Sequence, residues 1–235
     1  MSIAYLRLKR TMEKNTECFL CDLEAEIEQK YLDNYLQELV MDSKARERII
    51  ESRGFCNGHS YKLLIEANKP TSSDGHGIAL VMQSITEHLI QELPTPQYNG
   101  KYNFFKMLVS LKRCPACIHV EDFMKMYIKE AADFLASSDD FRKMFKESKG
   151  LCIPHFIILT KGTRGLERNQ VQNILKVLYE VEGKNLQRLR AELAEYIRRQ
   201  SYEFSEKDRA AVANVQLRSI QKIAGRRGIM TQEQT

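Results

Sequence analysis

Six cysteines and two histidines of this chain fall into one motif that occurs twice. The motif is a C-x2-C pair followed, after 34 residues, by a C-x2-H pair, and no cysteine lies outside it. Three thiolates and one imidazole are a donor set of tetrahedral zinc sites. The sequence therefore predicts two zinc ions per chain, one in each copy of the motif. The predicted ligands are Cys18, Cys21, Cys56 and His59 in the first copy and Cys114, Cys117, Cys152 and His155 in the second.

Other uses of these cysteines fit the pattern less well. Disulfides are typical of secreted proteins, and they would leave the paired histidines unexplained. A thioredoxin-type C-x2-C pair belongs to a βαβ context, which this sequence lacks. An iron–sulfur cluster usually takes four cysteines, although histidine can replace some of them. Zinc is favoured, while iron and redox-active thiols stay open as alternatives.

The two motifs belong to a longer internal repeat. Residues 18–64 align on 114–160 without a gap and share 11 of 47 positions. The shared positions include the glycine before each third cysteine, where a tight turn is expected. This duplication predicts two domains. They are 1–97, with the first repeat, and 98–235, with the second repeat and long basic C-terminal helices, joined by a linker over 94–100.

The segments between the ligands have the apolar spacing of amphipathic helices. Each repeat predicts a long helix after the C-x2-C pair, a short helix that ends at the glycine, and a third helix at the C-x2-H pair. No segment shows the alternation of a strand. The predicted fold is all-α, with two tandem zinc-stapled helical hairpin repeats, each closed by its own metal, followed by longer packing helices. Helices are expected over 21–42, 117–136, 77–93, 169–200 and 206–224.

The net charge of +5 is confined to the end of the chain. Residues 184–235 carry 11 basic and 6 acidic side chains, and the preceding residues are neutral. Such a surface favours weak, non-specific binding of nucleic acid at most. No apolar run reaches the length of a membrane span, and the N-terminus lacks a secretory signal, so we expect a cytoplasmic protein that does not contact a membrane. Eight of these 11 basic residues define the predicted basic surface, and they are Arg188, Arg190, Arg198, Arg199, Arg218, Lys222, Arg226 and Arg227.

Four protein ligands at each metal leave no open position for substrate, and the chain has no recognisable catalytic motif. The sequence leaves the question of catalysis open but favours a non-enzymatic, zinc-binding helical module that binds a macromolecule, with a protein partner first. A thiol/zinc redox sensor or oxidoreductase is the alternative, and a weak nucleic-acid-binding regulator is the second. The oligomeric state is not determined by these features.

One resemblance follows from the same motifs. The segments "CPAC", "GLCIPH" and "GFCNGH" and the tail "LQRLRAELAEYIRRQSYEFSEKD" resemble an uncharacterised family of unknown function from bacteria and archaea. The resemblance covers most of the chain and implies a small soluble helical protein with C-x2-C and C-x2-H pairs as its signature. It implies no particular activity or partner.

Overall fold

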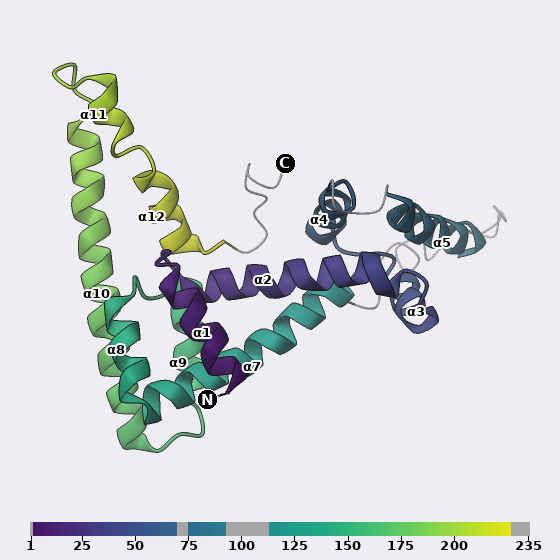
Figure 1. Cartoon of the computed structure of the whole chain (residues 1–235), viewed down its shortest axis with the longest axis horizontal. Coiled ribbons are helices and arrows are strands. Elements are labelled where there is room, and N and C mark those ends of the chain that lie inside the picture. Colours follow the sequence, from purple (N-terminus) through teal and green to yellow (C-terminus); the bar gives the residue numbers. More distant parts are fainter. Residues whose placement is uncertain (1, 70–74, 93–112, 227–235) are drawn as a thin grey trace, which may run out of the picture. The chain divides into compact units, whose positions relative to one another are not determined.

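The computed structural model describes residues 2–69, 75–92 and 113–226 (Figure 1). All regular structure within these ranges is helical, which confirms the all-α prediction. The predicted linker over 94–100 and Arg227 lie outside the described residues. None of the described helices combines the length and the apolar character needed to cross a membrane.

The chain forms two compact units, and each takes residues from both predicted domains. Unit 1 consists of Met1–Ala25 and Met124–Arg227, and the described part of unit 2 lies within Glu26–Phe123. The predicted boundary between residues 97 and 98 falls outside the described residues, so the division into two repeat domains stays a prediction. The compact units follow a different division, in which the two long helices of the repeats change unit along their length.

Unit 1 is built around aromatic side chains of both repeats. Tyr5 packs edge-on against Phe134, with ring centroids 5.2 Å apart, and it also contacts Phe141. Phe19 packs edge-on against Phe145. All of these phenylalanines except Phe134 are fully or almost fully buried. The elements of unit 1 are α1 (Ile3–Glu13), the start of α2 (Phe19–Asn34), the end of α7 (Pro115–Ser137), α8 (Asp139–Glu147), α9 (Ile153–Gly162), α10 (Arg168–Arg198), α11 (Glu206–Ala210) and α12 (Val215–Ala224).

Unit 2 has a largely aliphatic core that includes an aromatic pair. Tyr35 and Phe55 meet edge-on at 5.0 Å between ring centroids. Ile49, Leu63 and Val81 are almost fully buried beside them. Its elements are the end of α2, the π-helical turn η1 (Tyr35–Leu39), α3 (Ser43–Glu51), α4 (Asn57–Ala67), α5 (His76–Glu92) and the start of α7.

The helical hairpins of the two repeats end and restart in the same way. Asp42 caps α3 by accepting a hydrogen bond from the Ala45 amide, and Ser138 caps α8 in the same manner. The side chain of Arg46 donates to the carbonyl of Val40, and that of Arg142 donates to the carbonyls at the end of α7. Side-chain hydrogen bonds thus satisfy backbone groups that helix ends leave free.

Two helices differ from the sequence-based expectation. Helix α1 was not predicted, although Ser2 caps it and Leu8 and Met12 give it a buried face. The single helix expected over 206–224 is interrupted at 211–214, where backbone hydrogen bonds join residues three apart, as in a 3₁₀ turn, instead of four.

Candidate metal centres

The eight predicted ligands come together in two groups of four, but not in the predicted combination. The unit 1 cluster consists of Cys18, Cys21, Cys152 and His155. The unit 2 cluster consists of Cys56, His59, Cys114 and Cys117. Each cluster combines the C-x2-C pair of one repeat with the C-x2-H pair of the other, so the expectation that each repeat closes on its own metal is wrong. In each cluster the four candidate donor atoms lie within 4.8 Å of one another.

Helix length gives the physical reason for this exchange. After the first C-x2-C pair, α2 and η1 run from Phe19 to Leu39, which at 1.5 Å per residue is about 30 Å. The returning helix α3 has 9 residues and covers only about 13 Å. In the second repeat α7 has 23 residues and α8 has 9. In each repeat the short second helix does not bring the C-x2-H pair back to the C-x2-C pair at the start of the long helix. Ligand pairs from different repeats are therefore favoured over two pairs from the same repeat.

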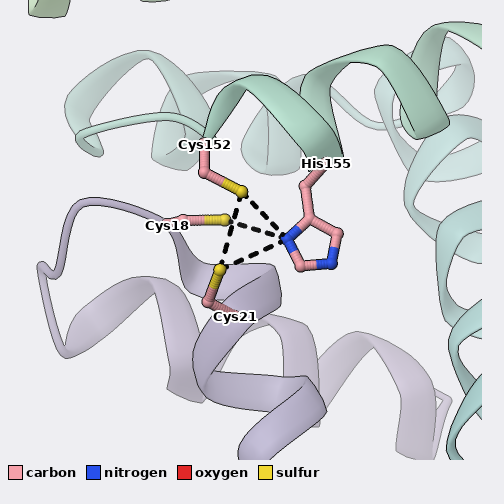
Figure 2. A group of neighbouring side chains, drawn as sticks. All are labelled: Cys18, Cys21, Cys152 and His155. Atoms are coloured by element: carbon pink, nitrogen blue, oxygen red, sulfur yellow. Dashed lines mark hydrogen bonds between the residues drawn. The ribbon is translucent and has the colours of Figure 1, made fainter. Parts of the chain in front are cut away.

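The unit 1 cluster is buried on all sides. Figure 2 shows the three sulfurs and the imidazole turned toward one centre, with Cys18 and Cys21 from one segment and Cys152 and His155 from the other. The Nδ1 atom of His155 lies 3.4 Å from the sulfurs of Cys18 and Cys21 and 3.2 Å from that of Cys152. No member of the cluster exposes more than 6% of its surface.

The unit 2 cluster has the same geometry but is more accessible. The Nδ1 atom of His59 lies 3.1 Å from the sulfur of Cys56, 3.5 Å from that of Cys114 and 3.3 Å from that of Cys117. His59 and Cys114 are buried, Cys117 is half-buried and Cys56 is exposed. One sulfur of this cluster therefore meets solvent, whereas its repeat equivalent, Cys152, has no exposed surface.

The donor spacings fit the edges of a tetrahedron around a metal ion. Tetrahedral bonds of about 2.3 Å to sulfur and about 2.0 Å to nitrogen separate two sulfurs by about 3.8 Å and a sulfur from a nitrogen by about 3.5 Å. Cys21 and Cys152 have their sulfurs 3.6 Å apart, and Cys56 and Cys117 have theirs 3.7 Å apart. A disulfide holds its sulfurs about 2.05 Å apart. All six cysteines are free thiols, and both clusters could bind a metal ion.

Each ligand pair lies at the beginning of a helix. Cys56 and Cys152 are the N-cap residues of α4 and α9, and the histidine follows in the first turn of the same helix. Cys18 and Cys114 directly precede α2 and α7. Residues at the N-cap and three positions later point to the same side, and the positive end of the helix dipole stabilises thiolates there. Two helix N-termini therefore converge on the three thiols and the imidazole of each cluster.

Glycines shape the turn before each third cysteine, and a buried ion pair also holds the turn in unit 1. Gly54 and Gly150 have φ of +94° and +72°, a conformation that L side chains rarely adopt, as the sequence predicted. In unit 1 the backbone amide of Leu151 donates to the Glu182 carboxylate at 2.6 Å. The ammonium of the fully buried Lys222 lies 2.6 Å from the same carboxylate. The turn that presents Cys152 is thus held by α10 and α12.

Two carboxylates of α2 lie beside the second ring nitrogens of the histidines, and neither was predicted to belong to the sites. Glu28 places a carboxylate oxygen 2.8 Å from Nε2 of His59 and also accepts a hydrogen bond from Lys62. Glu24 lies 3.6 Å from Nε2 of His155. A carboxylate at the second ring nitrogen fixes the orientation of a histidine metal ligand and raises its basicity. Glu24 and Glu28 are four residues apart and so lie on the same face of α2, and this spacing is the feature of the sequence that could have indicated their role.

Two thiols in each cluster have pKa shifts of opposite direction. Burial raises the pKa of Cys114, but hydrogen bonds, with His59 first, outweigh it and lower the value to about 6. Burial and the charge of Cys114 raise the pKa of Cys117 to about 12. In unit 1, hydrogen bonds with Cys18 and Cys21 lower the pKa of Cys152 to about 4, while the hydrogen bond to Cys152 is the main cause that raises that of Cys21. Neighbouring thiolates repel one another, and a bound cation compensates their charge.

A further histidine and the described residues of the predicted basic surface are not part of the clusters. His119 lies between the rings of Tyr31 and Phe123, at 4.5 and 4.6 Å between ring centroids, and belongs to neither cluster. Lys222 is buried and is not part of a basic surface. Most of the other predicted basic residues form ion pairs. These pairs are Arg188 and Arg218 with Glu17 and Glu192, Arg198 and Arg199 with Glu195, and Arg226 with Asp22.

The chain is similar to a protein family and to a protein of known sequence. Residues 1–229 match a family of unknown function (DUF6062). The chain is also 23% identical over 186 residues to a protein of Caldicellulosiruptor sp. (strain Rt8B.4) named "Uncharacterized 23.9 kDa protein in xynA 3'region", covering 73% of this chain and 84% of that protein. No solved structure matches the chain. Because the family match spans nearly every residue, the chain belongs to this family of unknown function, DUF6062.

Proposed function

We propose that this protein is a zinc-binding helical scaffold in which two structural Zn²⁺ ions join the repeats. The observation that carries the proposal is the closed donor set of each cluster, three sulfurs and one Nδ1 within 4.8 Å of one another. Structural zinc sites use four protein ligands in this manner, whereas catalytic sites keep one position for water or substrate. The proposed role is therefore non-enzymatic.

The ligand chemistry supports zinc over the alternatives. Three thiolates and one imidazole suit a borderline-soft ion without a redox function. Each cluster is compact around a single centre, with sulfurs 3.6 and 3.7 Å apart, which fits one ion. Reduced thiolates persist in reducing compartments, so we propose a cytoplasmic location.

The energetic consequence of zinc is large for a chain of this size. Binding of structural zinc contributes on the order of 10 kcal/mol of apparent folding free energy at neutral pH. The whole stability of a typical domain is about 5–15 kcal/mol. Since each cluster joins helix N-termini that are distant in sequence, removal of zinc is expected to unfold the surrounding helices.

Elemental analysis tests the proposal. Protein purified without added metal should contain about two zinc ions per chain. Replacement by Co²⁺ should give the strong visible absorption of a tetrahedral thiolate site, with the same stoichiometry. The proposal fails if the protein contains no zinc, or if it carries iron and sulfide with absorbance in the visible range.

For the partner, the charges favour a protein over a nucleic acid. The described basic residues near the C-terminus are largely neutralised by ion pairs, as for Arg188 and Arg218 with the buried Glu17. Helix α12 instead turns Leu217, Ile220 and Ile223 to solvent, at 53–63% exposure, while Ser219 and Lys222 face inward. Apolar residues gathered on one exposed helix face are typical of protein contacts.

Two measurements test this preference. Fluorescence anisotropy with random oligonucleotides should show only weak binding that disappears with added salt. If the protein partner is a second copy of this chain, sedimentation velocity over a range of concentrations should show self-association of the wild type that Ile220→Glu removes. Tight, salt-resistant binding of nucleic acid would contradict the preference for a protein partner.

A further inference from the structure

The two clusters have the same types of ligand but different surroundings, so their reactivities can be compared within one protein. Cys56 and Cys152 are equivalent positions of the repeat, and both cap a helix. Cys152 is fully buried, whereas Cys56 is exposed. The difference therefore comes from the surroundings of the site and not from the identity of its ligands.

Residues after α12 cover the unit 1 cluster. A Cβ atom on Gly225 would lie 3.4 Å from the sulfur of Cys152 and 3.9 Å from that of Cys21. The next residue, Arg226, donates to the carboxylate of Asp22 at 2.7 Å. Because Asp22 directly follows Cys21, this contact holds the end of the helix against the cluster.

The unit 2 cluster lacks an equivalent cover among the described residues. The position after Asn57 is Gly58, where a Cβ atom would meet no atom within 4 Å. Its repeat equivalent is Pro154, whose side chain would lie 3.8 Å from a Cβ atom on Gly225. Beside the exposed Cys56 lies the half-buried Cys117, with the two sulfurs 3.7 Å apart. A small oxidant can therefore reach one sulfur that already has a second sulfur in contact.

We propose that the unit 2 cluster is a peroxide-sensitive zinc site, in which oxidation joins Cys56 to Cys117 and releases the metal, while the unit 1 cluster keeps its zinc. This inference rests on the zinc occupancy proposed above. The oxidant is hydrogen peroxide or another small peroxide. Zinc thiolates are nucleophiles whose oxidation depends on their access to solvent.

The chemistry balances with peroxide alone. The Cys56 thiolate attacks one peroxide oxygen, the O–O bond breaks, and a sulfenic acid and hydroxide form. The Cys117 thiolate then attacks the sulfenic sulfur and displaces a second hydroxide, which closes the S–S bond. The two sulfurs lose two electrons, the peroxide gains them, and two protons from solvent complete two waters. Zinc leaves because two of its thiolate ligands are gone.

The test uses the full-length protein after its content of two zinc ions has been measured. Hydrogen peroxide is added while a chromogenic chelator records zinc release, and samples are alkylated and mapped by mass spectrometry. One zinc should leave about ten-fold faster than the other, together with a peptide cross-link between Cys56 and Cys117. Cys18, Cys21 and Cys152 should stay reduced during this phase.

A second variant tests the cause. Arg226→Ala keeps all eight ligands but removes the contact to Asp22, so it should accelerate oxidation of the unit 1 cluster and leave unit 2 unchanged. Arg198→Ala, which removes an exposed ion pair of α10, is the matched control and should change neither rate.

The outcomes separate the two proposals. A protein that purifies without zinc overturns the scaffold proposal and this inference with it. A protein that holds two zinc ions and loses both at one rate, or loses the unit 1 zinc first, overturns only the inference. An unchanged unit 1 rate in Arg226→Ala would overturn the explanation that the contact between Arg226 and Asp22 protects that cluster.

Discussion

The exchange of ligand pairs between repeats leads to an unusual result for single-cysteine variants. Cys56→Ser removes one of four donors from the unit 2 cluster, and its former partners are Cys114 and Cys117 rather than the cysteines of its own repeat. We expect this variant to hold one zinc ion instead of two. Loss of this zinc removes most of its apparent binding free energy, which is about 10 kcal/mol for a structural site. The stability of a whole domain is of the same size, about 5–15 kcal/mol.

Alkylation with mass mapping measures which thiols the substitution frees. Cys114 and Cys117 should react within minutes, while Cys18 and Cys21, at 4% and 2% exposure under an intact cluster, should remain protected. The mirror variant Cys152→Ser should free Cys18 and Cys21 and leave unit 2 protected. Labelling of Cys18 and Cys21 in Cys56→Ser would refute the exchanged pairing and restore closure within each repeat.

Three further predictions concern residues around the clusters. Glu28→Gln should weaken zinc binding in unit 2 by about 10–100-fold, measured by chelator competition, because His59 loses its orienting carboxylate. Lys222→Met should lower the free energy of unfolding of zinc-loaded protein by about 3–5 kcal/mol, measured by urea denaturation followed by circular dichroism, because Glu182 is left buried without its cation. Gly150→Ala should destabilise unit 1 in the same assay by more than about 1–2 kcal/mol, the usual cost of a left-handed conformation for a residue with a side chain. The added Cβ would also overlap the Glu182 carboxylate.

Each of these variants has a matched control. Glu24→Gln should affect unit 1 less than Glu28→Gln affects unit 2, because Glu24 lies 3.6 Å rather than 2.8 Å from its histidine. Adding Glu182→Gln to Lys222→Met should restore part of the lost stability, and a larger loss in the double variant would contradict the buried-charge explanation. Gly165→Ala has φ of +98° but no atom within 4 Å of a Cβ, so it isolates the backbone cost.

The sequence by itself determined the composition of the sites and most of the helices. Cysteine and histidine spacing picked out all eight clustered residues, because a metal site needs specific donors at short separations. Apolar periodicity found the long helices, and the two turn glycines were predicted because a tight turn depends on neighbouring residues only. Helix α1 and the break at 211–214 were missed.

Only the tertiary structure decided which pairs meet. Two C-x2-C and two C-x2-H pairs allow closure within a repeat or exchange between repeats, and the donor types are the same in both cases. The choice follows from the lengths of the helices: α2 and α7 are long, and α3 and α8 are too short to span the same distance back. It also depends on how these helices pack. The same holds for Lys222, whose charge suggested a surface residue until packing placed it against Glu182 in the interior. It also holds for the cover over Cys152, since Gly225 is distant from that residue in sequence and adjacent to it only in the folded chain.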